Sequence, residues 1–181
     1  MRRLLLSGCL CALPVLSAAA CTIAPAPGSS ATPPAQVLPV DARALAYGRT
    51  AGDVVQSPEL RDKIPALFGA DWMAASQGRG QIASGAAAFF ERGGPPRMVQ
   101  VAGKDYIAAA GCVATACRTR RVLLLVGEGG SQLLARLDDG AVTHYYSYAI
   151  GGGAPADAPA IVDAALLALQ SAGDPYPGAG S

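Results

Sequence analysis

The segment Cys112-Val113-Ala114-Thr115-Ala116-Cys117 lies between two stretches that favour β-strands. Its two cysteines enclose four small, uncharged residues. A disulfide between them would close the tip of a hairpin and hold it in few conformations. We therefore predict a stiff hairpin tip here, with the rest of the mature chain serving as its scaffold.

Short runs of β-favouring residues flank this segment and are separated by turn residues. They are Met98 to Val101, Tyr106 to Ala110, Arg120 to Val126, Leu133 to Leu137 and Val142 to Ile150. Connections this short leave no room for crossover helices, so we predict a five-stranded antiparallel meander. Val122 to Val126 is apolar without alternation, which predicts a central strand covered on both faces. The pair Asp139-Gly140 predicts a type I′ turn.

Helical patterns lie on both sides of the strand region. Ser57-Pro58-Glu59 has the form of an N-cap followed by a first-turn proline and an acid, which predicts a short helix from Pro58, interrupted at Pro65. A second helical piece is predicted around Ala70 to Gln77. An apolar stripe predicts a C-terminal helix from about Asp157 to Gly173. The predicted class is α+β, with the five-stranded meander flanked by short N-terminal helices and one C-terminal helix.

The N-terminus has the features of an export signal. A basic start, the apolar run Leu4 to Leu16 and the small residues Ser17 to Ala20 predict a signal peptide over 1–20. The apolar run is too short to span a bilayer. Ala18-Ala19-Ala20-Cys21 resembles the lipobox of bacterial lipoproteins, so we expect Cys21 to be lipidated. Because Ala18 stands where Leu is usual, ordinary cleavage after Ala20 is the alternative.

Three further segments follow the signal. Residues 21–40 are rich in Pro and Ala, which predicts a tether. We expect residues 41–175 to form the folded domain and residues 176–181 to form a disordered tail. The expected location is the periplasm, with the membrane reached only through a lipid anchor at Cys21. A soluble periplasmic protein is the alternative.

Composition and cysteine count agree with an exported single domain. The chain has 181 residues, a formal charge of +1 and only 15% charged residues. This composition shows no excess of basic residues that would indicate nucleic-acid binding. Of its five cysteines, Cys9 and Cys11 would leave with the signal and Cys21 would carry lipid. This leaves Cys112 and Cys117 to pair in an oxidising compartment.

The residues offer no catalytic or metal-binding constellation. His144 is the only histidine, and no Gly-x-Ser-x-Gly elbow is present. Asp138 and Asp139 are interpreted as turn residues that do not face each other across a substrate. Gly127 to Gly130 joins two strands and lacks the helix that would make it a phosphate site. We expect a binding module with no cofactor and no metal, and not an enzyme.

The loop is the expected contact surface. Val113, Ala114, Thr115 and Ala116 form its tip, and Arg118 and Arg120 place cations at its base. A disulfide that only secures the end of a hairpin is the alternative interpretation.

Several stretches together resemble the inhibitor of vertebrate lysozyme (Ivy) family. They are Pro95 to Tyr106, Cys112 to Cys117 and Val122 to Val126, which give a proline-led strand, a Gly-x-x-Tyr turn, a Cys-x4-Cys loop and a hydrophobic strand in the family's order. The likeness extends from about Pro58 to the C-terminal helix. It implies an exported α+β protein whose disulfide-closed loop enters the active-site cleft of a lysozyme.

The tip departs from the family. There a Lys, a Pro, a His and an Asp lie between the cysteines, and the His and Asp make the main polar contacts in the cleft, whereas this chain has Val-Ala-Thr-Ala. We expect a lysozyme-like muramidase as the protein partner, with polar contacts from Thr115 and the arginines at the loop base. The alternatives are an immunity-like protein that acts against a peptidoglycan-degrading toxin, or a structural envelope lipoprotein with no inhibition of C-type lysozyme. A homodimer is also left open.

Overall fold

The computed structural model describes residues 32–39 and 41–177. The predicted signal peptide, the lipidation site Cys21 and most of the predicted tether lie outside these residues. No helix in the described part of the chain is long and apolar enough to cross a membrane.

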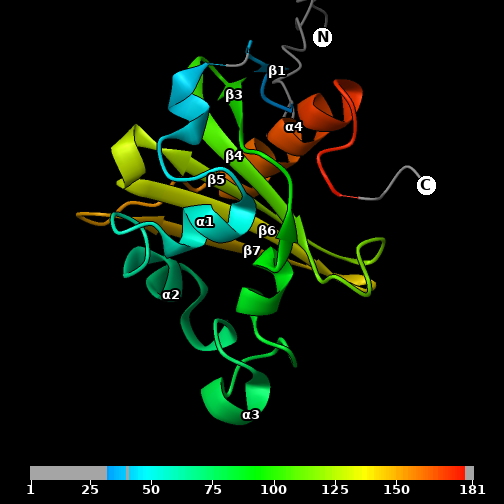
Figure 1. The fold of residues 1–181 in the computed structure, drawn as a ribbon. Coiled ribbons are helices and arrows are strands. Elements are labelled where there is room, and N and C mark those ends of the chain that lie inside the picture. Colours follow the sequence, from blue (N-terminus) through cyan, green and yellow to red (C-terminus); the bar gives the residue numbers. More distant parts are fainter. Residues whose placement is uncertain (1–31, 40, 178–181) are drawn as a thin grey trace, which may run out of the picture. The chain divides into compact units, whose positions relative to one another are not determined.

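A seven-stranded sheet in the order β1-β3-β4-β5-β6-β7, with β2 paired to β4, forms the centre of the domain, and all its pairings are antiparallel (Figure 1). The strands are β1 (Ala35–Val37), β2 (Arg92–Gly93), β3 (Arg97–Val101), β4 (Lys104–Cys112), β5 (Arg120–Gly127), β6 (Gln132–Asp139) and β7 (Val142–Ala149). The α+β class and the meander from β3 to β7 are confirmed. The predicted number of five strands is wrong, because β1 and β2 add to the sheet.

Strand β1 comes from the stretch predicted to be a tether. It pairs with β3 from Ala35 opposite Val101 to Val37 opposite Val99. The backbone N–H of Ala102 donates to the carbonyl of Pro34 at 2.8 Å. Only the three residues of β1 form this strand, and the prolines flank it instead of interrupting it. The folded domain therefore begins before the predicted boundary at residue 41.

The helices are short except for the last. They are η1 (Ala42–Leu45), α1 (Ala51–Gln56), α2 (Lys63–Phe68), η2 (Gly69–Asp71), α3 (Ala75–Gly78), η3 (Ala86–Phe90), η4 (Glu128–Gly130) and α4 (Ala158–Ser171). Thr50 and Asp53 form a reciprocal capping box at the start of α1. The helix predicted from Pro58 is wrong, because the chain turns between α1 and α2. Pro65 is the third residue of α2, where its missing N–H costs no intrahelical bond.

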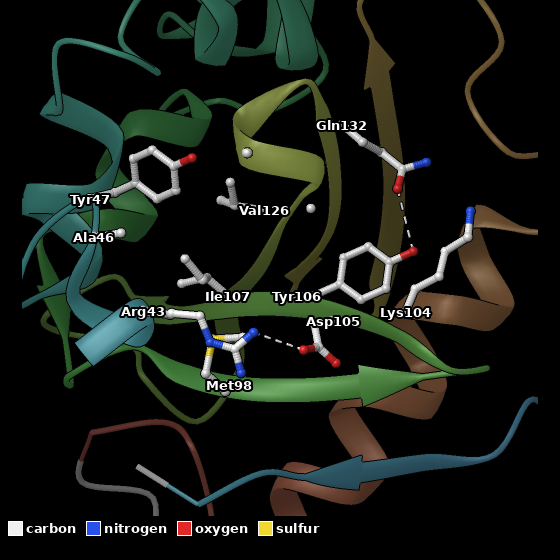
Figure 2. Close-up of a pocket in the computed structure, with 12 residues that line it drawn as sticks. Arg43, Ala46, Tyr47, Met98, Lys104, Asp105, Tyr106, Ile107, Val126 and Gln132 are labelled. Atoms are coloured by element: carbon white, nitrogen blue, oxygen red, sulfur yellow. Dashed lines mark hydrogen bonds and ion pairs between the residues drawn. The ribbon is translucent and has the colours of Figure 1, made fainter. Parts of the chain in front are cut away.

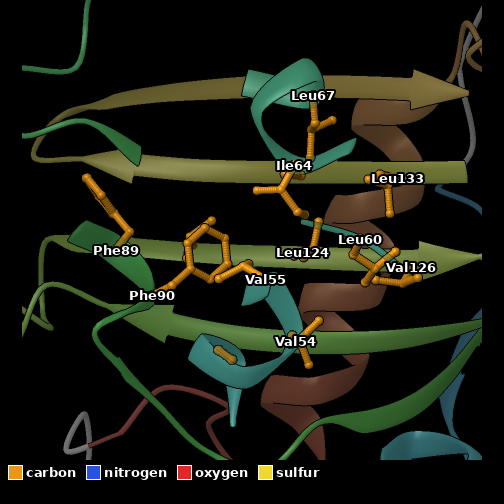
Figure 3. Close-up of a cluster of buried hydrophobic side chains, with 14 of the residues drawn as sticks. Val54, Val55, Leu60, Ile64, Leu67, Phe89, Phe90, Leu124, Val126 and Leu133 are labelled. Atoms are coloured by element: carbon orange, nitrogen blue, oxygen red, sulfur yellow. The ribbon is translucent and has the colours of Figure 1, made fainter. Parts of the chain in front are cut away.

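The sheet has an apolar core on each face. On one face, α1, α2 and η3 pack against side chains such as Leu124 and Val126 (Figure 3). On the other, α4 packs against the alternate side chains, including Leu123 and Leu125. Strand β5 lies between β4 and β6 and contributes to both cores, so the predicted central strand is confirmed.

The tight turn predicted at Asp139-Gly140 differs from the prediction. Asp139 pairs with Val142, so Gly140 and Ala141 form the β6–β7 turn. Only Gly140 has a positive φ, of 68°, as a type II′ turn requires at its first position. The type I′ pattern occurs instead between β3 and β4, where Ala102 has φ 49° and Gly103 has φ 79°.

The C-terminal segment also differs from the prediction. Tyr176 was predicted to belong to a disordered tail, yet its side chain is buried in the core beneath α4. The guanidinium carbon of Arg121 lies 4.7 Å from the centre of its ring. An aromatic ring of this size stabilises the segment by its burial. Residues 178–181 lie outside the described part of the chain.

Candidate functional site

The disulfide predicted between Cys112 and Cys117 is present, and the two Cα atoms are 4.9 Å apart. It closes the connection between β4, which ends at Cys112, and β5, which begins at Arg120. Two backbone hydrogen bonds support the same closure: the N–H of Val113 donates to Arg120 at 3.1 Å, and the N–H of Arg120 donates to Ala116 at 2.8 Å. The loop base is therefore held both covalently and by hydrogen bonds.

The tip of the loop is exposed and its base is packed. Ala114 and Thr115 are exposed, whereas Ala116 is half-buried. Val113 is also half-buried and packs against the core on the α1 and α2 face. Cys112 is fully buried. The loop thus offers two small side chains to solvent from a firmly anchored base.

Arg120, predicted to contact a partner, has contacts within the protein. Its Nε donates to Asp139 at 2.7 Å, and Nη2 donates to the hydroxyl of Ser84 at 2.6 Å. Its guanidinium carbon lies 4.9 Å from the centre of the Phe89 ring. Charge-assisted hydrogen bonds of this kind fix the side chain. Arg120 therefore anchors the loop base to β6 and to the segment before β2.

The two acidic residues predicted to lie in a turn belong to strand β6. Asp139 lies directly opposite Arg120, and Asp138 lies directly opposite Arg121. The Asp138 side chain is buried and accepts hydrogen bonds from Arg121, Arg136 and Thr143. These carboxylates stabilise the sheet beside the loop.

A shallow hollow of about 480 Å³ lies beside the loop. Its lining residues are Arg92, Ala114, Thr115, Ala116, Cys117, Arg118, Thr119 and Pro177. Both arginines are exposed, and the lining contains no Asp or Glu. The hollow thus combines two cationic groups, two threonine hydroxyls and the loop backbone, a set suited to an anionic group such as a carboxylate.

Arg92 was missed by the sequence reasoning. Strand β2 brings it to the loop, because Arg92 lies opposite Cys112 in the β2–β4 pairing. A Cβ atom on the next residue, Gly93, would lie 2.5 Å from the Cβ of Ala51 and 2.8 Å from the carbonyl oxygen of Ala110. Glycine is required for this close approach. In the sequence, the Gly93-Gly94 pair is the one local signal that could have indicated the close approach of β2.

A second hollow of about 520 Å³ lies at the other end of β4, near Lys104 to Ile107 (Figure 2). Its floor is apolar and includes Met98, Ile107 and Val126. At its rim Arg43 donates to Asp105 at 3.0 Å. Hydrogen bonds from Gln100 and Arg43 hold the pKa of Asp105 below its ordinary value. An apolar group with a polar end would fit there, but this hollow is remote from the disulfide.

The only histidine in the sequence, His144, lies on strand β7. His144 is half-buried and lies against Tyr146, with ring centres 6.4 Å apart. No three His, Cys, Asp or Glu side chains within residues 32–39 and 41–177 are grouped so that they could hold a metal ion.

A scan against protein-family models and searches of curated proteins and of solved structures found no match. The function must therefore be inferred from the loop and its surroundings. Among the predicted site residues, Cys117 and Arg118 line the hollow beside the exposed tip, whereas Cys112 is buried. Arg120 is half-buried and held by Asp139 and Ser84.

Proposed function

We propose that this protein is an exported, lysozyme-inhibitor-like binding protein that presents its disulfide-closed loop to a lysozyme or another muramidase. The observation that carries the proposal is the exposed tip of Ala114 and Thr115 on a base closed by the disulfide and two backbone hydrogen bonds. The resemblance to the Ivy family supports it. A tip held in few conformations loses little entropy on docking.

The chemistry of muramidases suits this surface. Most glycoside hydrolases have two carboxyl groups on either side of the bond they cleave, so their clefts are acidic. The tip is narrow because its exposed side chains are only those of Ala and Thr. Arg92 and Arg118 beside it would pair with carboxylates at the cleft rim. In this proposal Arg120 positions the loop and does not contact the partner.

The uncharged tip favours a second candidate. Val-Ala-Thr-Ala has no charged side chain, and the Thr115 hydroxyl is its only side-chain donor to a catalytic carboxylate. An immunity-like protein directed at a bacterial muramidase would need shape complementarity at the tip and charge only at the base. A structural envelope lipoprotein would need neither. For all three candidates we propose a periplasmic location with a lipid anchor at Cys21.

The test uses the mature chain from Thr22, which retains β1. It is titrated against C-type, G-type and bacterial muramidases in a cell-wall clearing assay. We expect inhibition of at least one class and a strong loss of inhibition in the Arg92→Ala, Arg118→Ala variant. The matched control is Arg49→Ala, Arg61→Ala, which removes two exposed arginines that do not line the hollow.

Two results would count against the proposal. Failure to inhibit any class would favour the structural lipoprotein. Inhibition that survives both the arginine substitutions and Cys112→Ala, Cys117→Ala would move the contact surface away from the loop. Inhibition of a bacterial muramidase alone would favour the immunity-like candidate.

A further inference from the structure

Strand β7 forms one edge of the sheet, and no strand in the described part of the chain pairs with its outer side. It has eight residues, Val142–Ala149, with no proline and no Asp, Glu, Lys or Arg. The opposite edge, β1, has three residues and lies between Pro34 and Pro39. Short edge strands, charges and prolines are the usual protection against edge pairing, and β7 has none of them.

The register defines which backbone groups face outward. The N–H of Ile150 donates to the carbonyl of Ser131 at 2.9 Å, and the β6–β7 pairing continues from there without a bulge. In an antiparallel pair, alternate residues direct both backbone groups to the partner strand. The even-numbered residues of β7 therefore bond to β6. Thr143, Tyr145, Ser147 and Ala149 direct their N–H and C=O groups away from the sheet.

Exposed apolar side chains gather at the same edge. Val142 is 55% exposed, Tyr145 39% and Ile150, directly after the strand, 59%. The faces of β7 are nevertheless packed. Tyr146 contacts Phe68 of α2 with ring centres 4.8 Å apart, and the hydroxyl of Tyr145 donates to Asp163 of α4 at 2.8 Å. The strand is thus held in place while its outer backbone groups remain unpaired with any described strand.

We propose that β7 pairs antiparallel with β7 of a second copy of this chain, so that one sheet runs through both copies. An antiparallel edge is complementary to itself about a two-fold axis, because each outward N–H meets an outward carbonyl of the same strand in the other copy. The strand carries no formal charge, so two copies do not repel each other there. The second copy is favoured over an unrelated peptide because Val142 and Ile150, at the two ends of the strand, would face each other across the axis.

This dimer is independent of the proposed function. The disulfide loop joins β4 to β5, and two strands, β6 and β7, follow β5 before the edge. Pairing at β7 would leave the loop of each copy exposed, at opposite ends of the joined sheet. A dimer without muramidase inhibition, or inhibition by a monomer, would therefore separate the two proposals.

The experiment compares Ser147→Pro with Ser147→Ala in the mature chain. Proline at 147 removes an outward N–H and no bond to β6, whereas alanine keeps that N–H. By symmetry each dimer loses two hydrogen bonds, so we expect about tenfold weaker dimerisation for Ser147→Pro and unchanged dimerisation for Ser147→Ala. Sedimentation equilibrium measures the dimer dissociation constant of each variant, and far-UV circular dichroism verifies that each variant is folded.

A second variant tests the edge without proline. Ser147→Lys keeps the backbone N–H and brings like charges together across the axis, so it should also weaken the dimer. High salt screens these charges and should partly restore dimerisation of this variant. A monomeric wild-type chain at several hundred micromolar would overturn the proposal. So would a dimer unaffected by both variants, or protection of the Thr143 and Ser147 amides from hydrogen exchange only when another protein is added.

Discussion

Arg121 and Asp138 lie directly opposite each other on β5 and β6, and the guanidinium group donates to the buried carboxylate at 3.3 Å. The same carboxylate accepts a bond of 3.0 Å from Arg136. Arg136 in turn donates to Asp163 of α4 at 2.8 Å. This chain of ion pairs joins two strands to the helix that covers them.

Replacing Asp138 should therefore be costly. We expect Asp138→Asn to lower the free energy of unfolding by about 3 kcal/mol, because two arginines would lose a buried counter-charge. Urea denaturation at pH 7 measures the change. Asp62→Asn is the matched control, since the Asp62 side chain is 91% exposed. This substitution should change the free energy of unfolding by close to zero. Equal effects of the two substitutions would contradict the assigned role of Asp138.

Ala102 occupies a turn position that disfavours its side chain. Its φ of 49° lies in the left-handed region, and the residue is exposed. Ala102→Gly should raise the free energy of unfolding by about 0.5 to 1 kcal/mol, because glycine removes the strain without loss of packing. The control is Ala66→Gly, an exposed position in α2, which should lower it by about 1 kcal/mol. Thermal unfolding of the two variants measures both changes. If both substitutions changed the free energy of unfolding in the same direction, the prediction would be refuted.

The disulfide should add modestly to stability. Closing so short a loop restricts the unfolded chain by about 2 kcal/mol in the chain-entropy model. We expect the reduced protein to stay folded, because residues outside the loop form nearly all of the two cores. Its free energy of unfolding in denaturant should fall by about this amount. Comparison of oxidised protein with protein kept in a thiol reductant measures the loss. Complete unfolding on reduction would show that the scaffold depends on the bond.

Tyr146 gives the fold a dependence on alkaline pH. Burial, followed by the hydrogen bond of 2.9 Å to Asp71, raises its pKa above the ordinary value. Since the unfolded chain ionises near pH 10, this contribution to stability is complete below about pH 10 and is lost as pH rises toward the folded-state pKa. Tyr146→Phe should lower stability by about 1 kcal/mol at pH 8. The variant should also lose less unfolding free energy than the wild type between pH 8 and pH 11. An equal loss in the two proteins would contradict the role assigned to Tyr146.

The meander could be predicted because each of its strands carries its own pattern of β-favouring residues and turns. β1 and β2 could not, since three and two residues are too few to show a period, and each exists only through pairing with a longer strand. Tyr176 was missed for a similar reason. A single aromatic residue among Pro and Gly gives no local signal, and its burial depends on Arg121 and α4.

The candidate site could be predicted only in part. The loop and its disulfide followed from the cysteines and the flanking strands. The direction of Arg120 depends on Ser84, Phe89 and Asp139, which are distant in sequence. Arg92 reaches the loop only through the register of β2 with β4.

The division within the loop between packed and exposed residues bears on how such a protein evolves. Cys112, Val113 and Arg120 carry the structural contacts, whereas Ala114 and Thr115 are exposed at the tip. Exposed substitutions of this kind usually change stability by less than about 0.5 kcal/mol. Under the proposed function, selection could therefore exchange the two tip residues almost freely and direct one scaffold to successive partners, while the fold remained the same.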